Sequence, residues 1–142
     1  MNYIFSAIFL YFFLGFLLYI FQRRIVFNKS GHPGSPKDYN LGNTEEVYIK
    51  TEDNLKLLSW YHKGNNSLPL LVYFHGNSFH IGDRAYRIQK YIEKNWSVLL
   101  VSWRGFGGNE GNPTEKNLYK DAEAVLKWIK NNTEFKLSLI HI

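Results

Sequence analysis

The stretches LLVYFHGN, Leu70 to Asn77, and VLLVSWRGFGGNEG, Val98 to Gly111, decide the fold of this chain. Each is a short apolar run that ends abruptly in glycine and polar residues. Runs rich in leucine, valine and aromatic residues and bounded by turn residues are typical of strands buried on both faces. Two parallel strands of this kind bring their polar loops to one edge of a sheet, where α/β proteins place binding and active sites.

The composition predicts one small domain with a substantial core. The chain has 142 residues, a net charge of +5 and 18% aromatic residues, and it has no cysteine. Disulfides, thiolate metal sites and a cysteine nucleophile are therefore excluded. The lysines are scattered, and no dense basic run occurs outside Arg23-Arg24. We therefore expect no nucleic-acid partner, and a basic surface near anionic lipid explains the charge better.

An unbroken run from Tyr3 to Phe21 carries no charged residue. At about 1.5 Å per residue, its length is close to the thickness of the hydrocarbon core of a bilayer. A cleaved secretory signal is the alternative, but the positive residues follow the apolar run and no small-x-small cleavage site closes it. We predict a transmembrane anchor over residues 1–24. The arginines that follow it favour a cytoplasmic location for the globular part.

The rest of the chain is predicted to divide into a linker over residues 25–43 and a domain over residues 44–142. Prolines and glycines between residues 28 and 42 argue against regular structure there. Alternating polar and apolar residues over 46–50 and 55–61, with turn residues between them, predict an antiparallel hairpin.

Two helices are expected between the later strands. A helical period predicts the first over 82–95, before a strand over 96–103, and its apolar face is Ile81, Ala85, Ile88 and Ile92. Asn112 as N-cap, Pro113 as the first helical residue and Glu115 as the capping-box acid predict the start of the second. Its Asp121 is expected to face solvent or to pair with a lysine.

A final apolar stretch over 135–142 is expected to form the last strand. The expected order is then a hairpin followed by β-α-β-α-β, which is an α/β fold with a parallel sheet.

The turn His75-Gly76-Asn77 follows the first buried strand and precedes a helix. Glycine allows the backbone to approach a ligand, and the amides after it can direct free N–H groups at a developing negative charge. A tight strand-to-helix turn without a chemical role is the alternative.

The glycines between Arg104 and Gly111 resemble a phosphate-binding loop only superficially. The stretch lacks the lysine of G-x-x-x-x-G-K-[ST], and its spacing is not G-x-G-x-x-G before a helix. An ordered loop over the sheet edge fits the sequence better, with Arg104 bonded to carbonyls or to an acid.

These residues resemble the α/β-hydrolase superfamily, and more closely its membrane-anchored serine hydrolases related to serine aminopeptidases and prolyl oligopeptidases. The resemblance covers nearly the whole chain, from the apolar N-terminus through the linker and hairpin. The motifs that carry it occur in the family's order: His75-Gly76-Asn77, Ile81-Gly82-Asp83-Arg84, Arg104-Gly105-Phe106-Gly107, GNPTE at 111–115, and Leu118-Tyr119-x-Asp121-Ala122.

The resemblance implies the N-terminal half of an α/β-hydrolase sheet behind one transmembrane helix. It also implies an esterase, thioesterase or peptidase-like serine hydrolase that acts on an acyl ester, thioester or peptide and needs no cofactor. In this family the backbone N–H at the position of Asn77 is an oxyanion-hole donor, and His75 and Gly76 shape the turn. His75 is not the expected base, because the triad runs in the order Ser, acid, His. The expected site-lining residues are Ser78, Arg104, Gly105 and Gly107.

The sequence contains no G-x-S-x-G nucleophile motif. Ser138 and His141 are three residues apart on an expected strand, so they point to opposite faces and cannot readily hydrogen-bond. No nucleophile and no metal site is assigned. We expect a truncated hydrolase that keeps the oxyanion turn, lacks the triad and is inactive alone, so whether the chain is an enzyme stays open. The alternative is a non-catalytic, membrane-tethered binding or scaffold domain.

Overall fold

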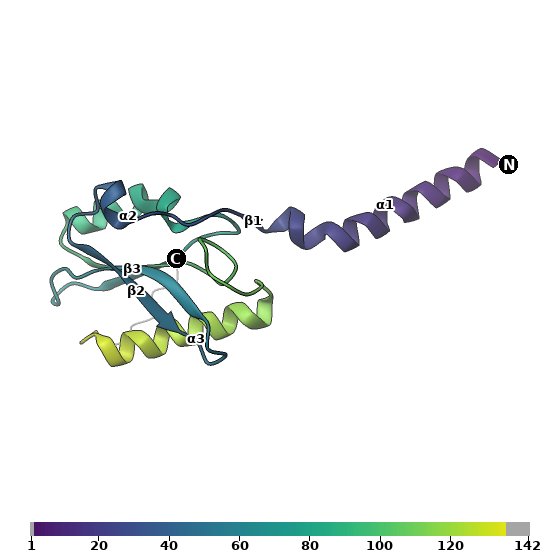
Figure 1. Ribbon diagram of the computed structural model, residues 1–142. Coiled ribbons are helices and arrows are strands. Elements are labelled where there is room, and N and C mark those ends of the chain that lie inside the picture. Colours follow the sequence, from purple (N-terminus) through teal and green to yellow (C-terminus); the bar gives the residue numbers. More distant parts are fainter. Residues whose placement is uncertain (1, 136–142) are drawn as a thin grey trace.

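The computed structural model describes residues 2–135 (Figure 1). A four-stranded sheet has the order β2-β3-β6-β4, and a two-stranded sheet pairs β1 with β5. In Figure 1, α2 and α3 lie on opposite sides of the large sheet and α1 extends away from the domain. The elements are α1 Asn2–Val26, β1 Asn28–Lys29, 3-10 helix η1 Pro36–Tyr39, β2 Thr44–Lys50, β3 Lys56–His62, β4 Leu70–Phe74, β5 Ser78–Phe79, 3-10 helix η2 Ile81–Arg84, α2 Ala85–Glu93, β6 Ser97–Val101 and α3 Glu115–Asn132.

The predicted hairpin is confirmed. Strands β2 and β3 pair antiparallel, from Thr44 opposite His62 to Lys50 opposite Lys56. At the turn, the backbone N–H of Thr51 donates to the carbonyl of Leu55 at 2.9 Å. The β3 strand then pairs antiparallel with β6, so the hairpin is joined directly to the central strand.

The predicted parallel pair is also present. Strands β4 and β6 run parallel, from Leu70 opposite Ser97 to Phe74 opposite Val101. All five residues of β6 are buried, as its continuous apolar composition predicts. Within the described residues β2 and β4 are the two edge strands of this sheet. The strand expected over 135–142 lies outside the described residues, except for Phe135, which is not in a strand.

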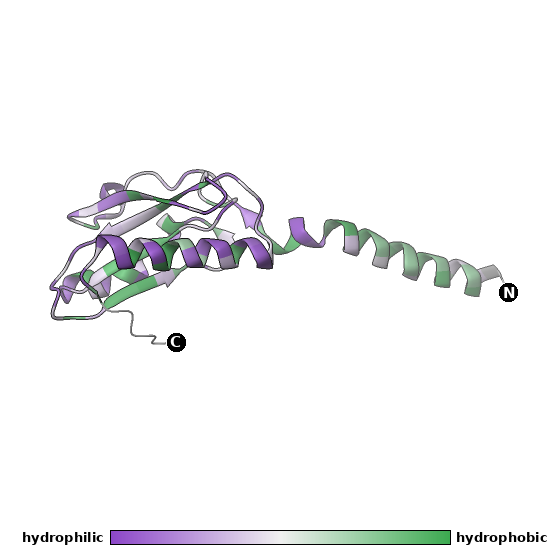
Figure 2. Ribbon diagram, turned by 90° about the horizontal axis from the view of Figure 1, so that it is seen from below, coloured by the Kyte–Doolittle hydropathy of each residue, from purple (hydrophilic) through white to green (hydrophobic). Residues whose placement is uncertain are grey.

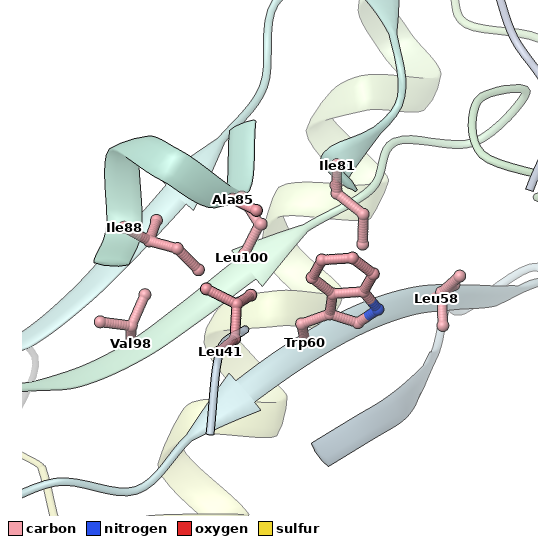
Figure 3. Close-up of a cluster of buried hydrophobic side chains, with 8 residues drawn as sticks. All are labelled: Leu41, Leu58, Trp60, Ile81, Ala85, Ile88, Val98 and Leu100. Atoms are coloured by element: carbon pink, nitrogen blue, oxygen red, sulfur yellow. The ribbon is translucent and has the colours of Figure 1, made fainter. Parts of the chain in front are cut away.

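The core has two halves, one on each face of the sheet. Successive side chains of β6 alternate between them, with Val98 and Leu100 on the face toward α2 and Leu99 and Val101 on the face toward α3. Figure 3 shows the first half, where Ala85 and Ile88 of α2 lie over the strands. The members of this half are Leu41, Leu58, Trp60, Ile81, Ala85, Ile88, Val98 and Leu100. The second half is built from Ile49, Leu57, Leu99, Val101, Ala124, Val125 and Ile129.

Both helices differ from the sequence expectation at their first turns. The helix expected over 82–95 is a 3-10 turn, η2, followed by the shorter α2. The N-cap of α3 is Thr114 rather than Asn112, because the Thr114 side chain accepts a hydrogen bond from the N–H of Asn117 at 3.2 Å. Pro113 therefore precedes the helix, and Glu115 is its first residue.

The segment over 28–42 was expected to lack regular structure, and this expectation is wrong. It contains β1 and η1. Ser35 caps η1 in a capping box with Asp38, and Pro36 occupies the first helical position, where its missing N–H costs no hydrogen bond. Leu41 then enters the core beside Trp60, so the segment packs on the domain.

Helix α1 is the one helix within residues 2–135 that is long and apolar enough to cross a membrane. Its large apolar side chains are exposed along most of its length, and the ribbon of α1 in Figure 2 is mostly green (hydrophobic), with a purple (hydrophilic) turn near the domain.

Replacing Ile129 by alanine tests the packing of α3. Ile129 is fully buried in the second half of the core, whereas Leu126 of the same helix is 40% exposed. We expect Ile129→Ala to lower the free energy of unfolding by about 2–4 kcal/mol. Leu126→Ala should lower it by less than about 1 kcal/mol. Denaturant unfolding of the detergent-solubilised chain measures both, and equal losses would contradict the placement of α3.

Candidate active site

The candidate site lies where β4 and β6 end together. Phe74 and Val101 are register partners at the last pair of the parallel ladder. The turn His75-Gly76-Asn77 and the segment Ser102-Trp103-Arg104 therefore leave the sheet at the same edge, as the sequence predicts.

His75 and Trp103 link the two strand ends. Nε2 of His75 accepts a hydrogen bond from the backbone N–H of Trp103 at 3.3 Å, and the indole N–H of Trp103 donates to the carbonyl of His75 at 2.8 Å. The Trp103 ring also stacks on Phe74 with centroids 4.5 Å apart. Because Nε2 is an acceptor, the proton of the neutral imidazole is on Nδ1.

His75 is held in its neutral form. It is only 3% exposed, and burial lowers its pKa to about 4. A hydrogen bond with the backbone of Gly76 partly offsets this effect, and the electrostatic influence of Arg84 and His80 lowers the pKa of His75 further. These contacts place His75 as a structural part of the turn.

Asn77 is exposed, and its carbonyl and side chain bond to the start of β1 and the end of α1. Its carbonyl accepts a hydrogen bond from the N–H of Asn28 at 3.1 Å, and its side-chain amide donates to the carbonyl of Val26 at 2.8 Å. Its backbone N–H makes no hydrogen bond within residues 2–135. This N–H is therefore an unpaired donor at the candidate site.

Two aromatic contacts also join the segment after α1 to the His75-Gly76-Asn77 turn. The ring of Phe27 meets Phe106 edge to face, with centroids 6.2 Å apart, and Phe106 meets the His75 ring in the same way at 5.1 Å. The parallel pairing of β1 with β5 lies beside these contacts. The residues that follow α1 thus pack directly on the turn that carries Asn77.

Arg104 is the buried charge beneath the site. It is 2% exposed, and its Nε donates to Asp121 at 2.8 Å while Nη1 donates to Asp53 at 2.8 Å. Asp121 is completely buried and also accepts from the backbone N–H of Arg104. The expectation that Asp121 faces solvent or pairs with a lysine is therefore wrong, and the alternative that Arg104 binds an acid is correct.

Asp53 completes this cluster from the hairpin turn. Hydrogen bonds from Arg104, and then from the Thr51 hydroxyl, hold the pKa of Asp53 well below its usual range. Lys120 lies 3.9 Å from the same carboxylate. Since the guanidinium is occupied by two carboxylates, Arg104 organises the loop rather than offering its charge to a ligand.

The glycine loop after Arg104 is tightly closed. The N–H of Gly105 donates to the carbonyls of Asn109 and Glu110 at 3.1 Å. Gly105 and Gly107 have φ values of +75° and +57°, and an added Cβ would lie 2.8 Å from Gly111 O and 2.8 Å from Ser102 Oγ, respectively. These positions require glycine. Gly107 borders a cleft of about 410 Å³ beside the hairpin, but none of residues 75–78 lines it.

The other residues considered from the sequence are Ser78, Ser138 and His141. Ser78 begins β5 and is half-buried, and its carbonyl lies 3.5 Å from a guanidinium nitrogen of Arg84. Ser138 and His141 lie outside the described residues. The oxyanion and site-lining roles of the turn and the glycine loop stay predictions.

The chain matches several curated relatives over most of its own length. It is 32% identical to an uncharacterized protein of Mycobacterium tuberculosis over 84% of this chain and 44% of that protein. It is 29% identical to the alpha/beta hydrolase domain-containing protein WAV2 of Arabidopsis thaliana over 87% and 43% of the two chains. For the lysophosphatidylserine lipase ABHD12 of Danio rerio the identity is 26% over 67% and 30%. The chain thus spans less than half the length of these relatives. No family model matches it.

Solved structures agree with this relationship. The Pyrococcus furiosus esterase Pf2001 superposes with a TM-score of 0.58 and 25% identity, over 75% of this chain and 42% of the esterase. An alpha-beta hydrolase from Vibrio vulnificus gives a TM-score of 0.54 and 29% identity, over 66% and 32%. Over two thirds to three quarters of its length the chain has the α/β-hydrolase fold, and its sequence is similar to that of α/β-hydrolase domain-containing proteins.

Substitutions of Arg104 and Asp53 should lower the free energy of unfolding by very different amounts. Arg104→Met leaves the completely buried Asp121 without its counter-charge and should lower the free energy of unfolding by about 3–5 kcal/mol. Asp53→Asn should cost only about 1 kcal/mol, because that side chain is 33% exposed.

Denaturant unfolding measures these losses, and the double variant Arg104→Met/Asp121→Leu is the control. It removes both buried charges and should recover part of the loss. A double variant less stable than Arg104→Met alone would contradict this account.

Stability should fall as the pH drops from about 6.5 to 4, because unfolded His75 binds a proton near pH 6.5 and folded His75 only near pH 4. At pH 4.5 the loss relative to pH 7.5 is on the order of 2 kcal/mol. His75→Gln should lack this contribution. The lowered pKa of His62 acts in the same direction in both proteins, so the difference between their unfolding curves isolates His75. Parallel curves would contradict a buried neutral His75.

Proposed function

We propose that this chain forms the oxyanion side of the active site of a membrane-anchored acyl hydrolase. The observation that carries the proposal is the backbone N–H of the exposed residue Asn77, which is unpaired within residues 2–135 and lies just after the end of β4, beside the end of β6. In the proposed reaction, a serine Oγ attacks the carbonyl carbon of the substrate while a base takes the serine proton. The carbonyl oxygen becomes an anion, and the N–H of Asn77 donates to it.

His75 supports this step without exchanging protons. Its neutral imidazole and its carbonyl tie the turn to Trp103, and Phe106 packs against its ring. A donor fixed before the reaction costs no reorganisation when the charge develops, which is why such groups stabilise transition states effectively. Ser78 is proposed to line the pocket beside this turn.

The nucleophile, the acid and the histidine of the triad are not assigned to this chain. It contains no G-x-S-x-G, and a serine needs a base oriented by a third group. We propose that the chain alone does not hydrolyse a substrate. The same missing motif favours a second candidate function, a non-catalytic binding or scaffold domain tethered to a membrane.

Ester hydrolysis is the proposed reaction class, ahead of thioester or peptide hydrolysis. The relatives named as a lipase and an esterase support this choice. Helix α1 supports a single-pass membrane anchor by its length and composition. The two arginines in its last turn support a cytoplasmic location for the domain.

A chimera tests the proposed donor. Residues 1–135 of this chain would be joined to the part of the Pyrococcus furiosus esterase that follows its matched segment, and hydrolysis of p-nitrophenyl esters would be measured in detergent. Asn77→Pro removes the backbone N–H and should lower kcat by about 10²–10³-fold. Asn77→Ala keeps the N–H and loses only the side-chain amide, so its kcat should stay within a few-fold of that of the unsubstituted chimera.

Two outcomes would contradict the proposal. Equal activity of the two variants would mean that the N–H of Asn77 is not an oxyanion donor, and a folded but inactive chimera would favour the scaffold function.

The 142-residue chain should not be labelled by a fluorophosphonate, and labelling at any serine would show a nucleophile that the proposal lacks.

A further inference from the structure

A basic cleft lies between the end of α1 and the segment that precedes α3. Its volume is about 580 Å³. On one side are Arg23 and Arg24 of α1, followed by Phe27 and Lys29, and on the other are Asn112 and Pro113. The cleft therefore joins the last turn of the apolar helix to the globular domain.

The cations of this cleft have no counter-charge among residues 2–135. Within residues 2–135, none of Arg23, Arg24 and Lys29 lies within ion-pair distance of a carboxylate, unlike Arg104. Nζ of Lys29 is 3.5 Å from the neutral Oδ1 of Asn112. Positive charges gathered around one hollow without counter-charges make a site for an anion.

The cleft is also held in shape. The N–H of Asn28 donates to the carbonyl of Asn77, and β1 pairs with β5. Phe27 is fixed against Phe106 at the base of the segment. The backbone that carries the three cations is thus attached to the domain, so binding an anion there does not require ordering a flexible linker.

The position of the cleft selects the source of the anion. Arg23 and Arg24 directly follow the apolar run that ends at Phe21, with only Gln22 between. In a bilayer spanned by α1, these residues lie at the level of the lipid headgroups, where phosphate groups are concentrated. Guanidinium groups match the geometry of phosphate oxygens, which they bind in bidentate fashion.

We propose that this cleft binds the phosphate group of an anionic phospholipid from the surrounding membrane. Arg23, Arg24 and Lys29 are the donors, and the bound headgroup fixes the domain against the membrane surface. The inference rests on the membrane anchoring in the proposed function but not on catalysis. A free phosphate ion has the same chemistry and is distinguished by the test.

The test is native mass spectrometry of the full chain in mixed micelles that contain equal amounts of dioleoyl phosphatidylglycerol and dioleoyl phosphatidylcholine. We expect retained lipid to favour phosphatidylglycerol by about tenfold, since charge-assisted bonds of this kind are each worth about that factor. The double variant Arg24→Gln/Lys29→Gln should lose most of the preference.

The matched control is Lys127→Gln/Lys130→Gln, which removes the same charge from exposed positions of α3. At about 1.5 Å per residue they lie roughly 18 Å or more along the helix from its start beside the cleft. The control should keep the preference, and its loss there would overturn the proposal in favour of a net-charge effect. Displacement of the lipid by millimolar inorganic phosphate would assign the site to free phosphate and overturn the lipid source.

A second measurement does not depend on the variants. Phosphatidylglycerol with a photoreactive headgroup should cross-link to residues 23–29 or 112–113 of the unmodified chain, and adducts confined to other regions would overturn the proposal. Alkaline carbonate extraction of membranes tests anchoring separately. A chain that resists extraction but shows no lipid preference contradicts this inference alone, whereas a chain released by carbonate contradicts the proposed anchor.

Discussion

The burial of Arg104 is the constraint on which the loops of this domain depend. A charged guanidinium in the interior is tolerated only with counter-charges and hydrogen bonds around it. Asp53 in the hairpin turn and Asp121 in α3 provide both, at 2.8 Å each from separate guanidinium nitrogens. One side chain therefore fixes three segments that are far apart in the sequence. Trp103, whose main chain and indole bond to His75, directly precedes Arg104 in the chain.

The features that the sequence predicted are those that apolar periodicity reports directly. The continuous run of β6 is buried on both faces, and the repeat of Ile81, Ala85 and Ile88 faces the core. Because parallel strands end at one edge, the neighbourhood of His75 and Trp103 also followed from the two strand ends. The local pattern of apolar and polar residues was thus enough to predict the paired strands of the sheet and the position of the candidate site.

The features that escaped prediction are contacts between distant polar residues. Nothing in the composition of 28–42 indicates that Asn28 pairs with Ser78, because strand partners depend on the tertiary fold. The burial of Asp121 did have a signal, since it precedes Val125 and Ile129 at intervals of four on one helical face. A carboxylate within such a stripe needs a buried cation, and Arg104, which directly follows the apolar run of β6, was available.

The short connection between α1 and the domain has a mechanical consequence. Only Phe27 separates Val26, the last residue of α1, from Asn28, the first of β1, and both of these neighbours bond to Asn77. The connection therefore restricts how far α1 and the domain can move relative to each other. In a bilayer, the tilt of a membrane helix responds to hydrocarbon thickness. If α1 spans a bilayer as proposed, a thinner or thicker membrane would change the height and angle of the His75–Asn77 turn relative to the lipid surface, without any change in the residues of the site.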